Sequence, residues 1–147
     1  MSADACGSVT GSYEQHFVQS KILSMTGRSY CAIEMDKLSI LDQLIDALTS
    51  LVALLALDSG CQWERQIESG LATALDLKDA EIGTTDLVAL SASVRHVYGG
   101  MGSFNDYAPV IYDAATRRYA RIPGTEDFDD IRGRVFDLAL ALIAVAP

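Results

Sequence analysis

Apolar residues recur at every third or fourth position from residue 38 onward, and this spacing constrains the fold more than any other feature of the chain. Residues spaced in this way line one face of an α-helix. Asp36 or Ser39 can accept hydrogen bonds from the free amides at the start of this helix, and Asp58-Ser59-Gly60 supplies its stop. The predicted buried face consists of Leu38, Leu41, Leu44, Ile45, Leu48, Val52 and Leu55.

The longest apolar run of the chain lies within and just beyond this helix. It extends from Ala47 to Leu57, has 11 residues and is bounded by Asp46 and Asp58. A membrane-spanning helix needs about 20 apolar residues. We therefore predict that this run is buried in the core of the protein and that no membrane is among its partners.

Three further segments have helical spacing. The second helix is predicted over residues 62–75. The third begins at the cluster Thr84-Thr85-Asp86 and ends at Gly99-Gly100, where Gly99 is expected to adopt the left-handed conformation. The last follows Thr125 as its N-cap, with acidic residues at the positive end of its dipole. The predicted buried faces are Trp63, Ile67, Leu71 and Leu75; then Leu87, Leu90, Val94 and Val97; then Phe128, Ile131, Val135, Leu138, Leu142 and Val145.

The segment between the third and last helices breaks the helical pattern, because residues 101–123 contain a glycine-rich turn and two prolines. Two β-prone runs, 110–112 and 118–122, flank the turn-forming residues 113–117 and predict a small hairpin. Such a hairpin is marginal unless it packs on the helices. The predicted fold is mainly α: a four-helix bundle-like domain with a short β-hairpin or irregular insertion before the last helix.

The first 34 residues differ in character from the rest of the chain. No helical or alternating period holds there for more than a turn. This favours a poorly ordered or loosely attached N-terminal extension, or a natural start at Met35, over the alternative of a helix around 13–25. Residues 35–147 are predicted to form a single compact helical domain, which is long enough to bury its own core.

The charge balance excludes one class of partner. The chain has 20 acidic and 11 basic residues, a net charge of −9, so nucleic-acid phosphates would be repelled over most of its surface. Its three cysteines, Cys6, Cys31 and Cys61, fit neither a paired disulfide framework nor a C-x-x-C motif. The N-terminus lacks the features of a secretory signal. We expect a cytoplasmic protein.

Residues suited to catalysis are few, since His16 and His96 are the only histidines. His96 lies close in sequence to Ser103 and Asp106, and a small hydrolase or nucleotide-binding enzyme could use these three residues. However, Ser103 lacks both the G-x-S-x-G elbow and the strand that precedes it. We predict a non-enzymatic protein without a cofactor and keep the enzyme as the alternative.

The acidic run at residues 126–130 resembles a cluster of oxygen ligands. An EF-hand loop begun at Asp127 would need Gly and Glu at the places that Arg132 and Leu138 occupy. The carboxylates are better explained by a helix N-terminus and by pairing of Asp130 with Arg134. No metal site is predicted.

A glycine-rich segment follows the third helix and reads GGMGSFND. A phosphate-binding loop would precede a helix, and often contain a lysine, whereas here a helix ends before it. We predict a structural turn in which Phe104 fills the core and Asn105 or Asp106 caps neighbouring backbone. If Gly99 and Gly102 have positive φ, valine at either position should destabilise the domain by about 1 to 3 kcal/mol. The motif comprises Gly99, Gly100, Met101, Gly102, Ser103, Phe104, Asn105 and Asp106.

Arginine and tyrosine are concentrated just after this motif. Both are enriched among the anchor residues of protein interfaces, and complementary charge speeds association. The same composition would also serve solubility alone, so composition leaves both interpretations open. The candidate partner-binding residues are Tyr107, Tyr112, Arg117, Arg118, Tyr119 and Arg121.

The motif GGMGSFND at residues 99–106 resembles the signature of a family of small, uncharacterised bacterial helical proteins. The similarity begins at about Met35, leaves residues 1–34 outside, and makes residues 114–122 a candidate addition to the family pattern. Small acidic proteins of this kind resemble the immunity proteins of bacterial toxin systems. The resemblance implies no enzymatic activity and a protein partner, such as a basic toxin or effector. A structural module that forms homo-oligomers is a further alternative.

Overall fold

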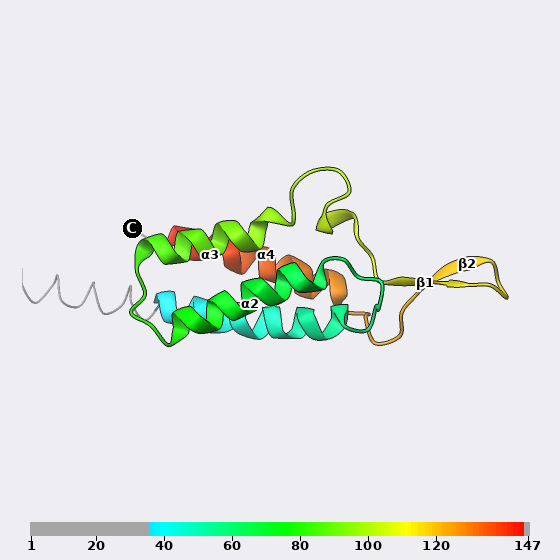
Figure 1. The fold of residues 1–147 in the computed structure, drawn as a ribbon, viewed down its shortest axis with the longest axis horizontal. Helices are drawn as coiled ribbons and strands as arrows, with labels where there is room; N and C mark the ends of the chain where they lie inside the picture. The colour runs from blue at the N-terminus through cyan, green and yellow to red at the C-terminus, as the bar shows by residue number, and fades with distance from the viewer. Residues whose placement is uncertain (1–35, 146–147) are drawn as a thin grey trace, which may run out of the picture. The chain divides into compact units, whose positions relative to one another are not determined.

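The computed structural model describes residues 36–145, which belong to one compact unit beginning at Asp36. The predictions for residues 1–34 lie outside the described residues. Four helices and one two-stranded antiparallel hairpin make up the fold, so the predicted fold class is confirmed (Figure 1). The elements are a first helix Asp36–Leu55, α2 Glu64–Lys78, α3 Thr84–His96, the 3-10 turn η1 Phe104–Asp106, β1 Val110–Asp113, β2 Arg118–Arg121 and α4 Phe128–Ala144.

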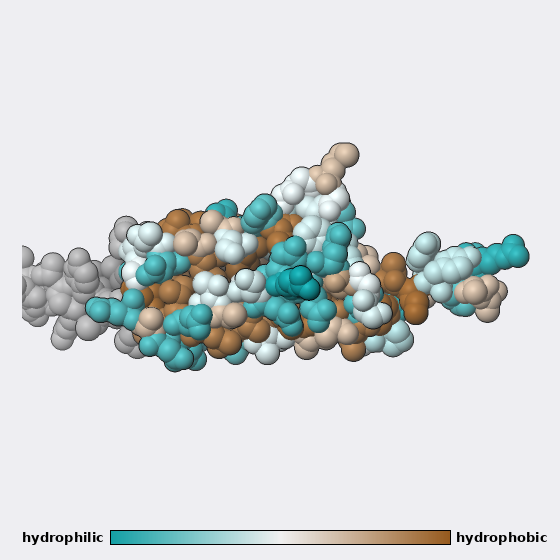
Figure 2. All heavy atoms as spheres, in the orientation of Figure 1, coloured by the Kyte–Doolittle hydropathy of each residue, from teal (hydrophilic) through white to brown (hydrophobic). Residues whose placement is uncertain are grey.

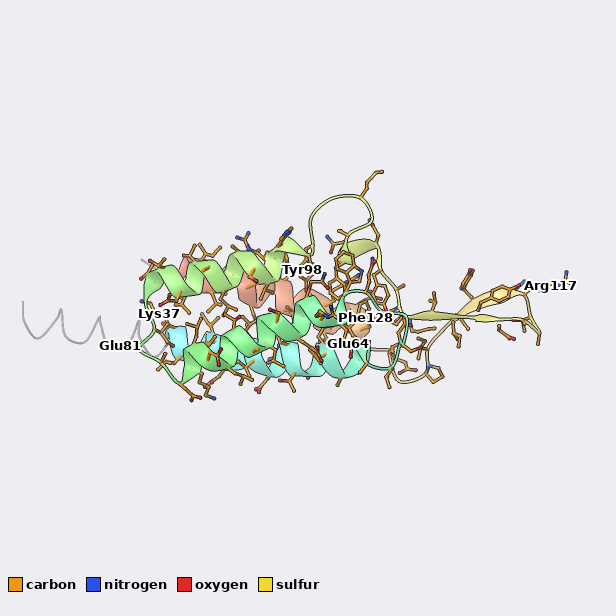
Figure 3. The ribbon with its side chains drawn as sticks, in the orientation of Figure 1. Lys37, Glu64, Glu81, Tyr98, Arg117 and Phe128 are labelled. Atoms are coloured by element: carbon orange, nitrogen blue, oxygen red, sulfur yellow. The ribbon has the colours of Figure 1, made fainter. Side chains whose placement is uncertain are left out.

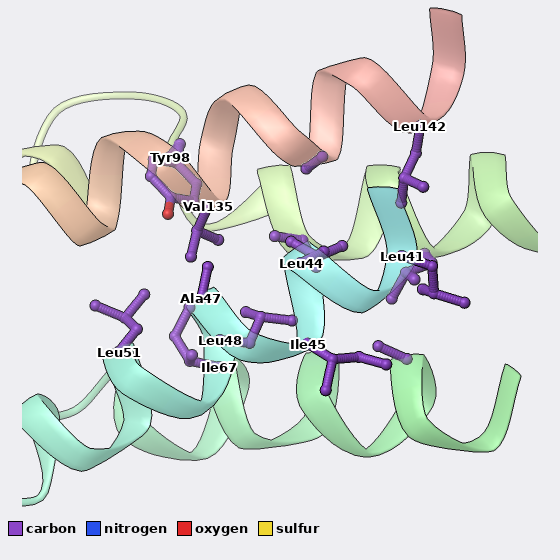
Figure 4. Packing of buried hydrophobic residues seen from close by; sticks show 14 of the residues in the cluster. Leu41, Leu44, Ile45, Ala47, Leu48, Leu51, Ile67, Tyr98, Val135 and Leu142 are labelled. Atoms are coloured by element: carbon purple, nitrogen blue, oxygen red, sulfur yellow. The ribbon is translucent and has the colours of Figure 1, made fainter. Parts of the chain in front are cut away.

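The first helix contributes the largest set of fully buried leucines to the core. Figure 4 shows its labelled leucines between the ribbons of α2 and α4. Two predictions about its face need correction: Leu38 is 43% exposed because it lies in the first turn, and Val52 is only half-buried. Ala47 and Leu51, which the predicted stripe omitted, are buried instead. The fully buried leucines of this helix are Leu41, Leu44, Leu48, Leu51 and Leu55.

The first helix has 20 residues and a mean hydropathy of 1.7 over its most apolar 18-residue window. By length and composition alone it could cross a membrane, although the 11-residue apolar run within the sequence is shorter. The buried core helix of a soluble protein passes the same test. In this structure its apolar face belongs to the same core cluster as Ile67 of α2 and Leu142 of α4.

The buried face of α2 differs from the predicted four-residue repeat. Its buried residues are Ile67, Gly70 and Ala74, whereas Leu75 is exposed and Trp63 lies half-buried just before the helix. A Cβ at Gly70 would lie 3.3 Å from the Val94 side chain of α3, so this glycine lets the two helices approach closely. The apolar spacing alone did not indicate that small residues would face α3.

Helices α3 and α4 pack against each other and complete the bundle. Leu87, Leu90 and Val94 are buried on α3 as predicted, and the buried Ser91 hydroxyl donates to the carbonyl of Ala139 on α4. Phe128, Val135 and Leu142 are buried on α4 as predicted. The remaining members of the two predicted faces, Val97, Ile131, Leu138 and Val145, are half-buried.

Thr125 does not cap α4 as predicted. It is fully buried, and its hydroxyl donates to the carbonyl of Ile122 at 2.7 Å, so the hydroxyl closes the turn before the helix. The N-cap residue is Asp127, which makes no side-chain capping bond. The predicted N-cap was therefore two residues too early.

The hairpin has the predicted strands and turn. Its register pairs Val110 with Arg121 and Asp113 with Arg118. The Asp113 carboxylate accepts hydrogen bonds from the Ala115 amide at 2.9 Å and the Thr116 hydroxyl at 2.7 Å, and these bonds, the hydroxyl first, lower its pKa. Arg117 closes the turn with a φ of 56°. The hairpin projects beyond the ends of the helices (Figure 1).

Candidate functional site

The motif and the hairpin lie at the same end of the bundle, where α3 ends and α4 begins. Figure 3 places Tyr98 and Phe128 beside the motif loop, with Arg117 at the far tip of the hairpin and Lys37 and Glu81 at the opposite end of the helices. All of the sequence-predicted site residues except His16 are described. The motif and Tyr107 form a structural set, in which Ser103 and Phe104 are buried, Tyr107 is half-buried and the other motif residues are exposed, and the hairpin residues form an exposed set.

Two glycines of the motif hold the chain in a conformation that other residues adopt rarely. Gly100 has a φ of 90° and Gly102 a φ of 72°. The expectation for Gly99 is wrong, because its φ is not positive and the left-handed position after α3 falls on Gly100. The Gly102 amide donates to the Asp106 carboxylate at 2.7 Å, which closes the loop on itself.

Because Gly102 has a positive φ and Gly99 does not, alanine at these two positions should affect stability differently. Gly102→Ala should lower the free energy of unfolding by about 1 to 2 kcal/mol, because alanine pays a steric penalty at positive φ. Gly99→Ala is the matched control and should leave it nearly unchanged, since its backbone has no positive φ and a Cβ there meets nothing within 4 Å. Urea unfolding measures both, and equal losses would contradict this account of the turn.

The side chains of Ser103 and Asn105 form hydrogen bonds with backbone groups of the turn. The Ser103 hydroxyl donates to the Tyr98 carbonyl at 3.4 Å and accepts from the Asn105 amide at 3.3 Å. The Asn105 side chain donates to the same Tyr98 carbonyl at 2.6 Å. These bonds satisfy the end of α3 and start η1, so both residues serve the fold.

Phe104 is the centre of an aromatic cluster and is fully buried. It meets Tyr98 and Phe128 edge to face, with ring centroids 5.4 and 5.7 Å away, and stacks on Tyr107 at 6.0 Å. The ring of Trp63 is also 6.0 Å away. The motif loop is thus fixed to the bundle by one side chain that touches residues before α2, after α3 and at the start of α4.

Arg132 completes this arrangement, and sequence reasoning missed its role. Its Nη1 atom lies 3.0 Å from each of the carbonyl oxygens of Phe104, Asn105 and Tyr107. Its Nη2 atom donates to Asp129 at 2.9 Å, and its guanidinium lies 5.1 Å from the centre of the Phe128 ring. An arginine on α4 therefore supplies the donors that the carbonyls of the turn need.

Tyr107 was predicted to contact a partner, but its hydrogen bond and ring contacts group it with the structural set. It is half-buried, and its hydroxyl donates to the Asp58 carboxylate at 2.6 Å. Burial, followed by the bond to Asp58 and the neighbouring Cys61, raises the pKa of this hydroxyl above the usual range of tyrosine. Burial likewise raises the pKa of Tyr98, whose hydroxyl donates to the Arg132 carbonyl at 3.0 Å, while the charge of Arg132 lowers it to a smaller extent.

These two raised values predict a loss of stability at high pH. The folded state holds both protons more tightly than the unfolded chain does, so this contribution is complete below the unfolded pKa of about 10. It declines as the pH rises above that value towards the folded pKa of each group. The free energy of unfolding, measured from pH 8 to pH 11, should fall less steeply for Tyr98→Phe than for the wild type, and identical slopes would count against the assignment.

His96 is not joined to the other two residues of the alternative enzyme site. It is exposed at the end of α3, and its side chain makes no hydrogen bond or ion pair with another residue of 36–145. Ser103 and Asp106 are held by the turn as described above. Within the same described range, no group of three or more His, Cys, Asp or Glu side chains is placed to hold a metal ion.

Residues of α4 line a surface hollow in two parts, which share Asp129, Gly133 and Asp137. One part, of about 230 Å³, reaches Tyr98 and Asn105, and the other, of about 530 Å³, extends along α4 past Asp130 and Asp137. Asp129 lines both parts and pairs with Arg121 and Arg132 at 2.9 Å each. The predicted pair of Asp130 with Arg134 is absent from the ion pairs of the described residues. Arg132 and Arg134 line the hollow beside the three aspartates, of which Asp130 and Asp137 are in no ion pair with a described residue.

The exposed set lies on the hairpin. Ile111 is 60% exposed, Tyr112 52% and Tyr119 72%, and the rings of the two tyrosines lie 5.3 Å apart. Arg121 differs from the prediction in part, because its guanidinium donates to the carbonyls of Thr125 and Glu126 and anchors β2 to the bundle. On the face shown in Figure 2, hydrophobic atoms gather at the base of the hairpin and hydrophilic atoms at its tip.

The hairpin also carries a charge opposite to that of its surroundings. Residues 110–121 contain one acid and three bases, a net charge of +2, whereas the other residues of 36–145 contain sixteen acids and six bases, a net charge of −10. Arg117 and Arg118 make no ion pair with any residue of this described range. The hairpin therefore offers apolar, aromatic and cationic groups that the fold itself leaves unused.

A family model described as "Domain of unknown function (DUF6966)" matches residues 57–119, which is fewer than half of the 147 residues. The expected similarity to a family of unknown function is confirmed in this coarse form. The match begins later than Met35 and includes residues 114–119, which were expected to be an addition. It covers α2, α3, the motif, β1 and the start of β2. No curated protein and no solved structure matches the chain.

Proposed function

We propose that this chain is a non-enzymatic protein-binding domain, and that it acts as an immunity protein which neutralises a bacterial toxin or effector. The observation that carries the proposal is the hairpin, on which Ile111, Tyr112 and Tyr119 are exposed. Beside them lie Arg117 and Arg118, which make no ion pair with any residue of 36–145. Tyrosine and arginine are the residues that most often anchor protein interfaces. A solubility role would not require exposed isoleucine and tyrosine on a projecting strand pair.

The acidic hollow along α4 provides the second half of the contact. It is lined by Asp129, Asp130 and Asp137 together with Arg132 and Arg134, and it reaches Asn105 of the motif turn. Asp130 and Asp137 make no ion pair with a residue of 36–145, so their charges are available to a partner. Lysine and arginine side chains of a basic toxin would be complementary to this lining, and the field of the acidic domain would speed their approach. The hairpin would then seat its aromatic side chains on a less basic part of the same partner.

The motif, which is anchored by its buried Phe104, contributes by holding these two surfaces together. Arg121 ties β2 to the start of α4, and Arg132 ties the motif turn to the same helix turn through Asp129. A preformed contact surface loses less conformational freedom when it binds. We also place the protein's site of action in the cytoplasm, because its three cysteines fit no paired disulfide framework.

The proposal is tested with the protein encoded next to this gene in its source genome. We expect that neighbour to be a toxin or secreted effector, that the purified chain binds and inhibits it, and that rising salt lowers the association rate more than it raises the dissociation rate. The proposal fails if the neighbouring genes encode no such protein and no protein partner is captured from the source cells.

A further inference from the structure

The hydrogen-bond pattern of the hairpin determines which backbone groups point away from it. The Ile122 amide donates to the Pro109 carbonyl at 3.0 Å, so residues 109 and 122 form a hydrogen-bonded pair that continues the β1–β2 register. Hydrogen-bonded and non-hydrogen-bonded pairs alternate along an antiparallel ladder. Val110 and Tyr112 therefore turn their amides and carbonyls outward along the free edge of β1, while Tyr119 and Arg121 do so along β2.

The edge of β1 is protected only at its two ends, by Pro109 just before the strand and by Asp113, its last residue. Proteins usually guard an open edge with charged side chains, prolines or bulges. Val110, Ile111 and Tyr112 include no charged residue and no proline, and their outward amides and carbonyls bond to no residue among 36–145. An isolated pair of strands is marginal in water, whereas three or more strands with an apolar face are stable.

We infer that a second copy of this chain pairs with β1 along this edge, with the two β1 strands antiparallel about a two-fold axis at Ile111. Val110 of each copy would then exchange two hydrogen bonds with Tyr112 of the other, which makes four across the interface. Ile111 would face its own counterpart across the axis in the closely spaced, non-hydrogen-bonded position. The edge is thus complementary to itself, as a two-fold interface requires.

Charge selects the β1 edge over the β2 edge. Pairing centred on Ile111 places Asp113 of each copy opposite the uncharged Pro109 of the other. Pairing of two β2 strands centred on Ala120 would bring Arg118 and Arg121 of both copies into one interface, where like charges repel. The hairpin projects beyond the helices, so the two acidic bundles would stay apart (Figure 1).

The inferred dimer does not depend on the proposed function. Edge pairing leaves both faces of each hairpin open, so a four-stranded sheet would present the tyrosines of both copies side by side. A toxin could bind either form. Dimerisation is measured without any partner, and partner binding is measured without reference to dimerisation, so the failure of one proposal is distinguishable from the failure of the other.

The first test is the mass of the purified full chain as its concentration rises, measured by sedimentation equilibrium. The wild type should move from 15.8 kDa towards twice that mass. Val110→Pro removes one outward amide without touching a hydrogen-bonded pair of the hairpin, and it should keep the mass at the monomer value. Val110→Thr retains the amide and should dimerise as the wild type does. A wild type that stays monomeric at every concentration, or a dimer that Val110→Pro leaves intact, overturns the inference.

The second test locates the axis by disulfide trapping with oxidised glutathione, in a chain whose Cys6, Cys31 and Cys61 are replaced by serine. Ile111→Cys should form a cross-linked dimer, because Cα atoms at a non-hydrogen-bonded pair lie about 4.5 Å apart, within disulfide range. Ala120→Cys on β2 pairs with Ile111 inside one hairpin and should cross-link far less. Equal cross-linking at the two positions would contradict pairing through β1.

Discussion

Phe104→Ala is expected to lower the free energy of unfolding by about 3 to 5 kcal/mol, the range typical of a fully buried phenylalanine. The side chain has no exposed surface and contacts four aromatic rings, those of Trp63, Tyr98, Tyr107 and Phe128. Its loss would leave a cavity where the turn, α3 and α4 meet. Thermal and urea unfolding followed by far-ultraviolet circular dichroism measure the effect.

Met101→Ala is the matched control for this prediction. Met101 belongs to the same loop and is a large apolar residue, but it is fully exposed at the loop tip. Its replacement should change the free energy of unfolding by less than about 0.5 kcal/mol, as is usual for surface positions. A loss for Phe104→Ala no larger than that for Met101→Ala would show that the motif does not hold the bundle end together.

Arg132→Ala should produce the second large effect, a loss of about 2 to 3 kcal/mol, because three backbone carbonyls lose their shared donor. The side chain of Arg132 is only 18% exposed, so water replaces the guanidinium poorly. Arg132→Lys keeps the positive charge but not the planar fork that reaches the turn and Asp129 together, and we expect it to recover less than half of the loss.

Arg134→Ala is the control for Arg132→Ala, since it removes the same side chain two residues later on α4. Arg134 is exposed and forms no ion pair with the other residues of 36–145. Its unfolding midpoint should match the wild type. If Arg132→Lys restored full stability, the interaction of the positive charge at residue 132 with the Phe128 ring and the Asp129 carboxylate would account for the effect. The hydrogen bonds to the turn would then not account for it.

The helices were predictable because their apolar spacing is local information. Leu87, Leu90 and Val94 repeat with the helical period, and the same face of α3 is buried in the folded protein. The prediction failed where packing between helices decides the buried face. Gly70 is buried where Val94 of α3 approaches it closely, Ala74 is buried as well, and Leu75 is exposed. The prediction that Thr125 caps α4 was wrong for a related reason. Its hydroxyl donates a hydrogen bond to the carbonyl of Ile122, in the turn before the helix begins.

The candidate site was predictable only in part. The structural role of the motif followed from its place after a helix, and Phe104 is buried as expected. Arg132 carried no local signal, because its three carbonyl partners lie 25 to 28 residues earlier in the chain. The positions of Tyr107 and Arg121 also depend on long-range bonds, to Asp58 and to α4, so composition could not separate them from the exposed Tyr112 and Tyr119.

We propose that the motif, through its buried Phe104, holds the end of the bundle and that the exposed hairpin binds the partner. The most direct test is the affinity of the double variant Tyr112→Ser, Tyr119→Ser for the toxin or effector identified by the experiment above. We expect affinity to fall about tenfold or more at an unchanged unfolding midpoint of the bundle, as for loss of interface anchors. The control variant Leu75→Ser, Val88→Ser removes two exposed apolar residues from the helices and should bind as the wild type does. Wild-type affinity in the hairpin variant would contradict the claim.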